Sequence, residues 1–388
     1  AARAQSEGAL DADKLVAEIT NNYGGTATKT GTGFPVNATV DGKSFTIDGD
    51  GNVTSTGSGN GPTERKLLSE ITGNETDNTL AKDNLGNPIT IPAGFEVDNP
   101  NDNVEDGIVV RDKTHTNTAG SEFVWIPVGD VKTKNKGTIN IELNRYTFDS
   151  NGNETKQGAN KIDTGYTGYT EDTAAKHDKN YGNTIAKDIE DFKSKAESSH
   201  GYYIGRYEAR TANERSSSTT DDNLKQITTK PNDYVYNYVT QRQAATLSRG
   251  MYTGTPFESD LVNSYAWDTA TLFLQTFGNN SKYSRQNSLN TGSPANTGTN
   301  NLAEASKIDK ICNVYDMASN FLEWSTETYS YISGPCTQRG GYYGDSGFYT
   351  SARFGDGRQQ QHLFIPPTFI LVELNADIEE LDILEELF

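Results

Sequence analysis

The sequence predicts an α+β fold in which short strands and long polar loops outnumber the helices. Only 33% of the 388 residues are apolar, while Gly alone contributes 37 residues. Asn, Ser and Thr are also abundant, and this composition favours strands joined by turns over helical packing. The 20 tyrosines and 15 phenylalanines supply bulky rings from which a core can be built.

The charge of the chain argues against two classes of partner. The formal net charge is −19 at pH 7, whereas nucleic acids and anionic membranes are bound by stripes of Lys and Arg. We therefore expect no nucleic-acid partner and no binding to an anionic membrane surface. Solubility is the simplest role for such a charge.

Metal-binding and membrane-spanning patterns are missing from the sequence. The four histidines, His115, His177, His200 and His362, are scattered and form no metal-binding spacing. No apolar segment approaches the length of a transmembrane helix. The chain opens with Ala1-Ala2-Arg3 rather than with Met, so we expect contact with a membrane only through an N-terminal anchor absent from this chain.

Residues 1–53 are predicted to form a small module of one helix followed by β-hairpins. Apolar residues at helical spacing run through residues 1–24. Asp41-Gly42 and Asp50-Gly51 mark tight turns between alternating strands in the segment that follows. The sequence TSTGSGNGPT then opens a flexible linker, which we expect to cover residues 54–84.

Four segments of the central part of the chain carry the patterns of regular structure. Residues 123–128 are expected to form a buried strand, and the family resemblance given below implies another strand at 202–209. Residues 239–248 are expected to form a helix, and the family resemblance given below implies a second helix at 260–273. The long polar insertion at 133–200 is predicted to form loops.

The most specific pattern lies toward the end of the chain. A Ser319-Asn320 turn leads into Phe321-Leu-Glu323-Trp324, and Arg339-Gly340-Gly341 and Ala352-Arg353 follow. This pattern resembles the end of the formylglycine-generating-enzyme-like domain, a member of the C-type-lectin-like fold group. The four segments described above resemble earlier elements of that domain in the same order. The resemblance implies that residues 85–372 form one C-type-lectin-like domain with a small twisted antiparallel sheet, few helices and much irregular structure.

The N-terminal end of the chain has a second resemblance, and the C-terminal end departs from the lectin-like family. Residues 1–53 resemble the globular part of pilin-like surface proteins of Firmicutes, which implies an extracellular location at a bacterial cell surface. The closing strand at 363–372 lacks the arginine that is usual in the lectin-like family. Residues 373–388 have no counterpart there and combine seven acidic residues with apolar residues at helical spacing. This acidic amphipathic tail is expected to dock on its own domain or to bind a partner, and a shifted reading frame near Gly357 is a third explanation.

The resemblance also bears on catalysis. The formylglycine-generating enzyme holds copper(I) with cysteines placed just after the Arg-Gly-Gly motif, because soft thiolates suit that ion. In this chain residues 339–353 contain no cysteine, and Cys312 and Cys336 both precede the motif. We therefore predict that the protein is not an enzyme and requires no cofactor. A divergent oxidase and a structural pilus or surface subunit are the alternatives.

We expect instead a non-enzymatic binding protein displayed at a surface. Residues 340–358 contain no Lys, Glu, Gln, Met or Trp, which are residue types that codons ending in C or T cannot encode. This bias resembles the variable region of the target proteins of diversity-generating retroelements, which use this fold. Loops rich in Tyr, Ser and Gly suit adaptable binding surfaces, because Tyr provides contact area at low entropic cost. The predicted ligand-binding residues are Tyr342, Tyr343, Asp345, Ser346, Phe348, Tyr349, Asp356 and Arg358.

The ligand is expected to be an extracellular protein or glycan. Arg339, Gly340, Gly341 and Arg353 are predicted to belong to the scaffold, because glycines allow a close turn and arginines tie strands to carboxylates. The alternative for Tyr342, Phe348 and Tyr349 is that their rings fill the core.

Two further features are implied near the Glu-Trp strand. Related domains bind calcium, which implies Asp316, the backbone carbonyls of Ser319 and Phe321, and Glu323 as calcium ligands in this chain. The alternative is that Asp316 caps a turn and that Glu323 pairs with an arginine such as Arg353. Cys312 and Cys336 flank the strand and are expected to form a disulfide across neighbouring strands or to remain two buried thiols.

Overall fold

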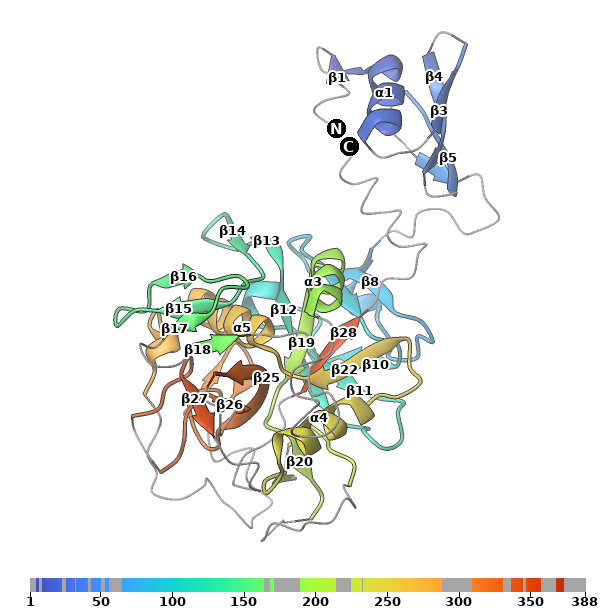
Figure 1. Cartoon of the computed structure of the whole chain (residues 1–388). Coiled ribbons are helices and arrows are strands. Elements are labelled where there is room, and N and C mark those ends of the chain that lie inside the picture. Colours follow the sequence, from blue (N-terminus) through green and yellow to red (C-terminus); the bar gives the residue numbers. More distant parts are fainter. Residues whose placement is uncertain are drawn as a thin grey trace. The chain divides into compact units, whose positions relative to one another are not determined.

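The chain contains two compact units, one within residues 1–65 and one within residues 66–373 (Figure 1). They are described from a computed structural model. The structure describes residues 5–6, 9–22, 26–31, 33–40, 43–49, 53–55, 65–163, 168–170, 189–213, 225–231, 233–287, 309–330, 336–344, 347–356 and 368–372. The acidic tail predicted at 373–388 lies outside these residues.

The first unit packs one helix against an antiparallel sheet. Its elements are β1 (Gln5–Ser6), β2 (Ala9–Leu10), α1 (Ala12–Asn22), β3 (Thr26–Thr30), β4 (Gly33–Val40), β5 (Lys43–Ile47) and β6 (Val53–Ser55), with β3 to β6 forming a sheet in chain order. Leu15 and Ile19, four residues apart on α1, are fully buried against Val36, Ala38 and Ile47. The predicted helix followed by hairpins is therefore confirmed.

The helix of this unit is shorter than predicted. It begins at Ala12 rather than near residue 1, because Asp11 acts as its N-cap. The Asp11 carboxylate accepts hydrogen bonds from the backbone N–H groups of Asp13 (3.0 Å) and Lys14 (3.1 Å). The residues before this cap form the short antiparallel pair of β1 and β2 instead of helix.

The second unit is organised around a six-stranded antiparallel sheet. Its strands, in spatial order, are β10 (Phe95–Val97), β11 (Val109–Asp112), β12 (Glu122–Pro127), β19 (Gly201–Gly205), β28 (Thr368–Val372) and β22 (Phe257–Leu261). All six residues of β12 are buried, as expected for a strand covered on both faces. The closing strand predicted at 363–372 exists as β28, which lies between β19 and β22.

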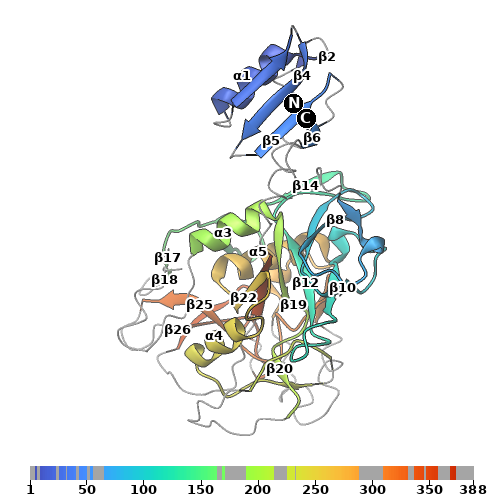
Figure 2. The same ribbon diagram turned by 90° about the vertical axis from the view of Figure 1, so that its right-hand side faces the viewer.

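Helices cover this sheet, and two of them lie where the sequence predicts them. They are α3 (Ile189–Ser198), α4 (Gln241–Gly250) and α5 (Ser264–Phe277), and Figure 2 shows α4 beside β22. Thr240 caps α4 in a capping box with Gln243. Asn263 caps α5 by accepting a hydrogen bond of 2.9 Å from the backbone N–H of Ala266.

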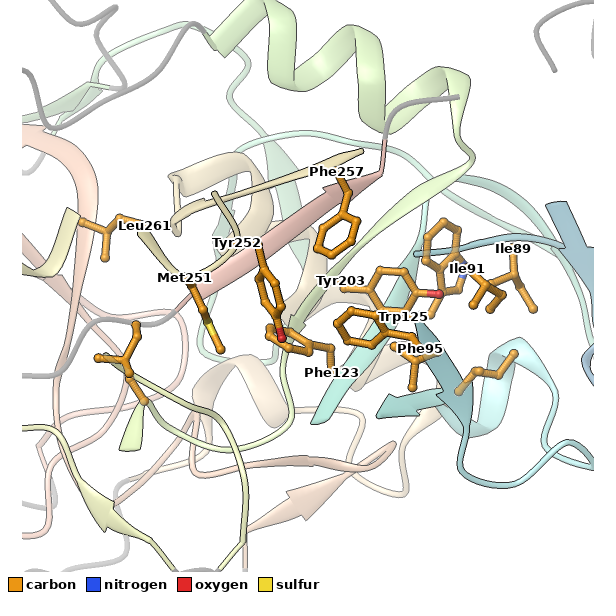
Figure 3. Packing of buried hydrophobic residues seen from close by; sticks show 14 of the residues in the cluster. Ile89, Ile91, Phe95, Phe123, Trp125, Tyr203, Met251, Tyr252, Phe257 and Leu261 are labelled. Atoms are coloured by element: carbon orange, nitrogen blue, oxygen red, sulfur yellow. The ribbon is translucent and has the colours of Figure 1, made fainter. Parts of the chain in front are cut away.

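The core between the sheet and α4 is built from aromatic rings, as the composition predicts. Figure 3 shows the rings of Phe95, Phe123, Tyr252 and Phe257 turned toward one another. The centroid of Phe95 lies 5.6 Å from that of Phe257 and 6.0 Å from that of Phe123, both in edge-on geometry.

A second, five-stranded antiparallel sheet contains the Glu323-Trp324 strand and the strand that ends at Arg339. Its strands, in spatial order, are β17 (Ile162–Asp163), β18 (Gly168–Thr170), β25 (Glu323–Tyr329), β26 (Cys336–Arg339) and β27 (Arg353–Asp356) (Figure 1). Glu323 is the Cα partner of Arg339, and Arg339 in turn is the partner of Arg353. The Glu-Trp strand and the Arg-Gly-Gly strand are therefore neighbours.

Short elements complete the unit. They are β7 (Lys66–Leu67), η1 (Leu68–Glu70), β8 (Thr79–Lys82), β9 (Pro88–Ile91), η2 (Val104–Asp106), β13 (Gly129–Lys132), β14 (Thr138–Ile141), β15 (Tyr146–Phe148), β16 (Glu154–Lys156), β20 (Arg210–Thr211), β21 (Tyr234–Val235), η4 (Tyr283–Arg285), β23 (Lys310–Ile311) and β24 (Val314–Tyr315). The fold is thus a mixture of helices and several small, mostly antiparallel sheets. The expectation of a single small sheet was wrong.

The unit also begins earlier than predicted. The sequence predicts that residues 66–84 belong to the linker, but β7 pairs with β8 and β8 pairs with β9 in a three-stranded sheet. Leu80 and Ala81 are buried there, so this segment contributes to the core. Within the described residues, no helix combines the length and the apolar character needed to cross a membrane.

Candidate functional site

Buried ion pairs hold the five-stranded sheet against α5. Arg339 donates to Asp268 on α5 at 2.5 Å, and neither side chain is exposed. Arg353 donates from Nε to both oxygens of Glu327 at 3.0 Å and also pairs with Asp268. Arg145 donates to Glu327 Oε1 at 2.5 Å. Arg339 and Arg353 therefore tie strands to carboxylates, which is the role the sequence predicts for them.

This network fixes the charge of Glu327. Burial alone would raise the pKa of its carboxyl group, but the guanidinium groups of Arg353, Arg145 and Arg339 outweigh burial and lower the pKa to about 2. Because Arg353 is engaged by Glu327 and Asp268, the expected alternative of a Glu323–Arg353 pair is wrong.

A row of aromatic rings in tilted and edge-on contact lies beside this framework, and we call Tyr342, Tyr343, Phe348 and Phe354 the aromatic face. The centroid of Tyr342 lies 4.5 Å from that of Tyr343 and 5.9 Å from that of Phe348, and Phe348 lies 4.1 Å from Phe354. All four side chains are partly exposed. The alternative in which the rings fill the core does not describe Tyr342 or Phe348, since each keeps solvent contact.

The aromatic face rests on buried support. Tyr343 packs edge-on against Phe321, which is 1% exposed, with centroids 5.6 Å apart. Its backbone N–H donates to the carbonyl of Asn320 at 2.8 Å. Tyr234 packs against the same cluster from β21. The predicted ligand-binding set did not include Phe354, Phe321 or Tyr234. Phe354 follows Arg353 on a strand, so its side chain points to the opposite side of the sheet from that of Arg353, and this alternation could have identified it.

The structure brings together only part of the predicted ligand-binding set. Tyr349 is partly exposed, but its ring stacks under the Arg285 guanidinium, 3.8 Å from the ring centroid, and Tyr349 bridges to Asn287. Asp356 ends β27, but its side chain lies outside the description. Asp345, Ser346 and Arg358 also lie outside the described residues.

Buried acidic residues gather behind the aromatic face. Glu208, Asp309, Asp316 and Glu323 are each 4% exposed or less. Glu208 accepts hydrogen bonds from the Phe321 N–H at 3.1 Å and the Asn320 amide at 2.5 Å. Asp309 accepts from the Tyr283 hydroxyl at 2.9 Å and the Ala318 N–H at 2.8 Å.

Burial of these carboxyl groups opposes their ionisation. Burial raises the pKa of Glu208 to about 8, with Arg210 and the hydrogen bonds from Phe321 and Asn320 acting in the opposite direction. Burial, together with the nearby Glu208 carboxylate, also raises the pKa values of Asp316 and Glu323 well above their ordinary range. Sequence reasoning identified Asp316 and Glu323 but missed Glu208 and Asp309.

The calcium ligands implied by the resemblance fit a cation in part. Glu323 Oε2 is buried and accepts no hydrogen bond within the described residues. Asp316 is involved in a turn, because its Oδ1 accepts from the Ser319 hydroxyl at 3.3 Å and its carbonyl accepts from the Ser319 N–H at 3.1 Å. In the described part of the chain, no three acidic, histidine or cysteine side chains are placed to hold one metal ion. A cation here would therefore need backbone carbonyls, such as those of Ser319 and Phe321, beside its carboxylates.

A small cavity adjoins two of these acids, Glu208 and Glu323. Its volume is about 30 Å³, and its walls include Tyr207, Glu208, Trp267, Tyr315, Met317 and Glu323. A space of this size holds a water molecule or a small cation.

The cysteines are not joined to each other. Cys312 and Cys336 are separate thiols, because Cys312 lies in the β23–β24 turn, where its Sγ is 3.8 Å from the Glu105 carbonyl. Of the two expected arrangements, the disulfide is wrong for this structure; the cysteines are separate thiols, of which Cys336 is buried and Cys312 is partly buried. Burial raises the pKa of the Cys312 thiol to about 12, which opposes formation of the thiolate that a copper site needs.

Two of the four histidines lie in the described residues. His115 pairs with Asp112, its Nδ1 lying 2.9 Å from Asp112 Oδ1, and His200 adopts a positive φ of 62° beside β19. His177 and His362 lie outside the description. Comparison of the chain with protein-family models, curated proteins and solved structures found no match.

Proposed function

We propose that this protein is a non-enzymatic, surface-displayed protein that binds an extracellular protein or glycan through the aromatic face. Its second unit would be a C-type-lectin-like domain, and the variable segment would be residues 340–358, diversified by a retroelement. The supporting observation is that residues 339–348 include both buried scaffold residues and partly exposed aromatic residues. Arg339 and Gly341 are buried, whereas Tyr342, Tyr343 and Phe348 between the scaffold residues are partly exposed.

A segment that combines a buried scaffold with partly exposed rings can accept different side chains at the exposed positions while the domain stays folded. Buried ion pairs and a close turn hold the backbone, while rings with solvent contact are available to a ligand. Tyr provides contact area, a hydroxyl group and little conformational freedom to lose on binding. The codon-compatible composition of 340–358 adds an independent reason to regard the exposed positions as variable.

The genomic locus tests this proposal directly. We expect a reverse transcriptase gene nearby and a template repeat that matches the coding region for residues 339–358. Copies of the locus from different isolates should differ at codons 342, 343, 345, 346, 348, 349, 356 and 358. Codons 339, 340, 341 and 353 should be constant. A locus with neither a reverse transcriptase nor variation at these codons would contradict the proposal.

Two alternative functions, a divergent oxidase and a structural subunit, can be distinguished from ligand display. A divergent oxidase would bind copper(I) and convert a cysteine-containing sulfatase peptide, and we expect the purified protein to do neither. A structural pilus or surface subunit would assemble through its N-terminal unit. Partial solvent contact of Tyr342 and Phe348 favours display over the purely structural role.

A further inference from the structure

We propose that Arg285, stacked on Tyr349, is an anion-binding element of the ligand site, and that the ligand is a glycan with a carboxylate-bearing sugar. This inference rests on the proposed function, because it names the chemistry of the ligand that the aromatic face would bind. Arg285 ends η4 and does not belong to the predicted ligand-binding set.

The first argument is an arginine whose donors are unused. The Arg285 guanidinium lies 3.8 Å from the centroid of the Tyr349 ring, and both residues are partly exposed. Among the described residues, no hydrogen bond or ion pair engages this guanidinium. A guanidinium presents a planar fork of N–H donors that matches the two oxygens of a carboxylate. Other arginines of the second unit already pair with carboxylates in this way: Arg111, Arg145, Arg206, Arg249, Arg339 and Arg353.

The second argument is that the stack is held in place from both sides. The Thr350 hydroxyl donates to the Tyr283 carbonyl at 2.7 Å, and the backbone of Tyr349 bridges to Asn287. The two chain segments that carry Arg285 and Tyr349 are therefore fixed against each other. Stacking on the ring also limits the freedom of the guanidinium, so little conformational entropy is lost when it binds an anion.

The stack adjoins the aromatic face. Tyr349 follows Phe348, whose ring centroid lies 5.9 Å from that of Tyr342 and 4.1 Å from that of Phe354. Consecutive Cα atoms are only about 3.8 Å apart, so the stack begins where the face ends. A ligand of a few sugar units that covers Phe348 can therefore also reach Arg285.

The charge of the chain indicates which kind of anion binds. The net charge of −19 repels polyanions and acidic protein surfaces at long range, so an isolated carboxylate suits the site better. A protein partner normally buries about 800 Å² on each side, whereas the rings of the face are only partly exposed. A carboxylate-bearing sugar needs less area, since its C–H groups pack on a ring while its carboxylate pairs with the arginine.

Binding of the full chain to a printed array tests the inference. The probes are oligosaccharides that end in glucuronic acid or sialic acid, the same oligosaccharides with a neutral terminal sugar, and an Asp-rich peptide. We expect binding to the acidic glycans to be at least tenfold tighter than binding to their neutral counterparts. Arg285→Gln should lose this preference. Arg285→Lys should lose most of it, because an ammonium group keeps the charge but not the fork.

Lys113→Gln is the matched control. Lys113 follows β11, and its ammonium group lies 3.9 Å from Glu96 in an exposed pair. The substitution changes the net charge by the same amount as Arg285→Gln, but it does so in the six-stranded sheet. Lys113→Gln should bind the array like the wild type.

The opposite results overturn the inference. Equal binding of acidic and neutral glycans, or an acidic preference that survives in Arg285→Gln, would show that Arg285 does not select the ligand. Tighter binding of the Asp-rich peptide than of the acidic glycans would assign the anion to a protein. The comparison of acidic with neutral probes needs only the wild-type chain, so it decides even where a variant fails to fold.

Failure of this inference differs from failure of the proposed function. Binding to none of the probes would contradict the acidic-glycan ligand and leave ligand display standing. Failure of ligand display would instead be seen at the genomic locus, as the absence of a reverse transcriptase and of codon variation.

Discussion

Arg145 and Glu327 form an ion pair of 2.5 Å in which neither side chain is exposed to solvent. The two residues come from the polar insertion and from β25, so this contact ties the insertion to the five-stranded sheet. Arg145 also donates to the carbonyls of Asn160 (2.8 Å) and Tyr169 (3.0 Å). A single buried guanidinium thus organises a segment that the sequence predicts to be loops.

Removing the charge of Glu327 should destabilise the second unit strongly. Glu327→Gln leaves the Arg145 guanidinium buried without its counter-ion, which typically costs about 3–5 kcal/mol. Chemical denaturation measures this loss. Glu142→Gln is the control, because its pair with Lys156 is exposed and should be worth about 1 kcal/mol or less. Equal losses for the two variants would contradict the role of the buried network.

The same carboxylate predicts a pH dependence. The pKa of Glu327 is lowered from 4.5 to about 2, so the folded state binds its proton less tightly than the unfolded state. The resulting stabilisation is fully present above about pH 4.5 and is lost as the pH falls toward about 2. The free energy of unfolding should therefore fall more steeply between pH 5 and pH 2.5 in the wild type than in Glu327→Gln. Parallel curves would show that the carboxylate is not perturbed.

Much of the fold was predictable because its signals are local. The sequence predicts helices at 239–248 and 260–273, and α4 and α5 occupy those positions. The buried strand at 123–128 was found from its apolar run and corresponds to β12. Hairpins in the first unit were found from Asp-Gly pairs between alternating residues.

The missed elements depend on contacts between distant residues. The insertion at 133–200 contains β14, the β15–β16 hairpin and α3, yet its composition is that of loops. Ion pairs such as Arg145–Glu327, 182 residues apart, have no local signature. Glu208 was missed as a site residue for the same reason, since its neighbours Asn320 and Phe321 are more than 110 positions away.

Substitutions in the aromatic face should destabilise the protein less than substitution of Phe321, the buried ring on which Tyr343 packs. Tyr342→Ser and Phe348→Ser combined should cost about 2 kcal/mol or less, because partly exposed rings bury only part of their area. Phe321→Ala should cost about 3–5 kcal/mol, since this ring is 1% exposed. Thermal unfolding of the two variants compares them directly. A larger loss for the double variant would make the face part of the core.

Gly340 should not accept a side chain. Its φ of +86° disfavours other residues, and a Cβ there would lie 2.5 Å from Glu323 Oε2. Gly340→Ala should therefore destabilise by at least about 2 kcal/mol. Gly250→Ala is the control, because a Cβ at the end of α4 meets no atom within 4 Å. Denaturation midpoints that fall equally, or not at all, would show that the turn has room.

Randomisation of the aromatic face tests the central claim most directly. A display library varied at Tyr342, Tyr343 and Phe348 of the aromatic face can be selected for folded protein and then for binding to lysozyme and to streptavidin. A matched library varied at Trp324, Arg339, Gly340 and Arg353 is the control. Most members of the first library should fold, and specific binders to both targets should emerge, while most members of the second should be lost at the folding step. Failure of the first library to fold, or its failure to yield binders, would contradict the assignment of this face as a ligand-display surface.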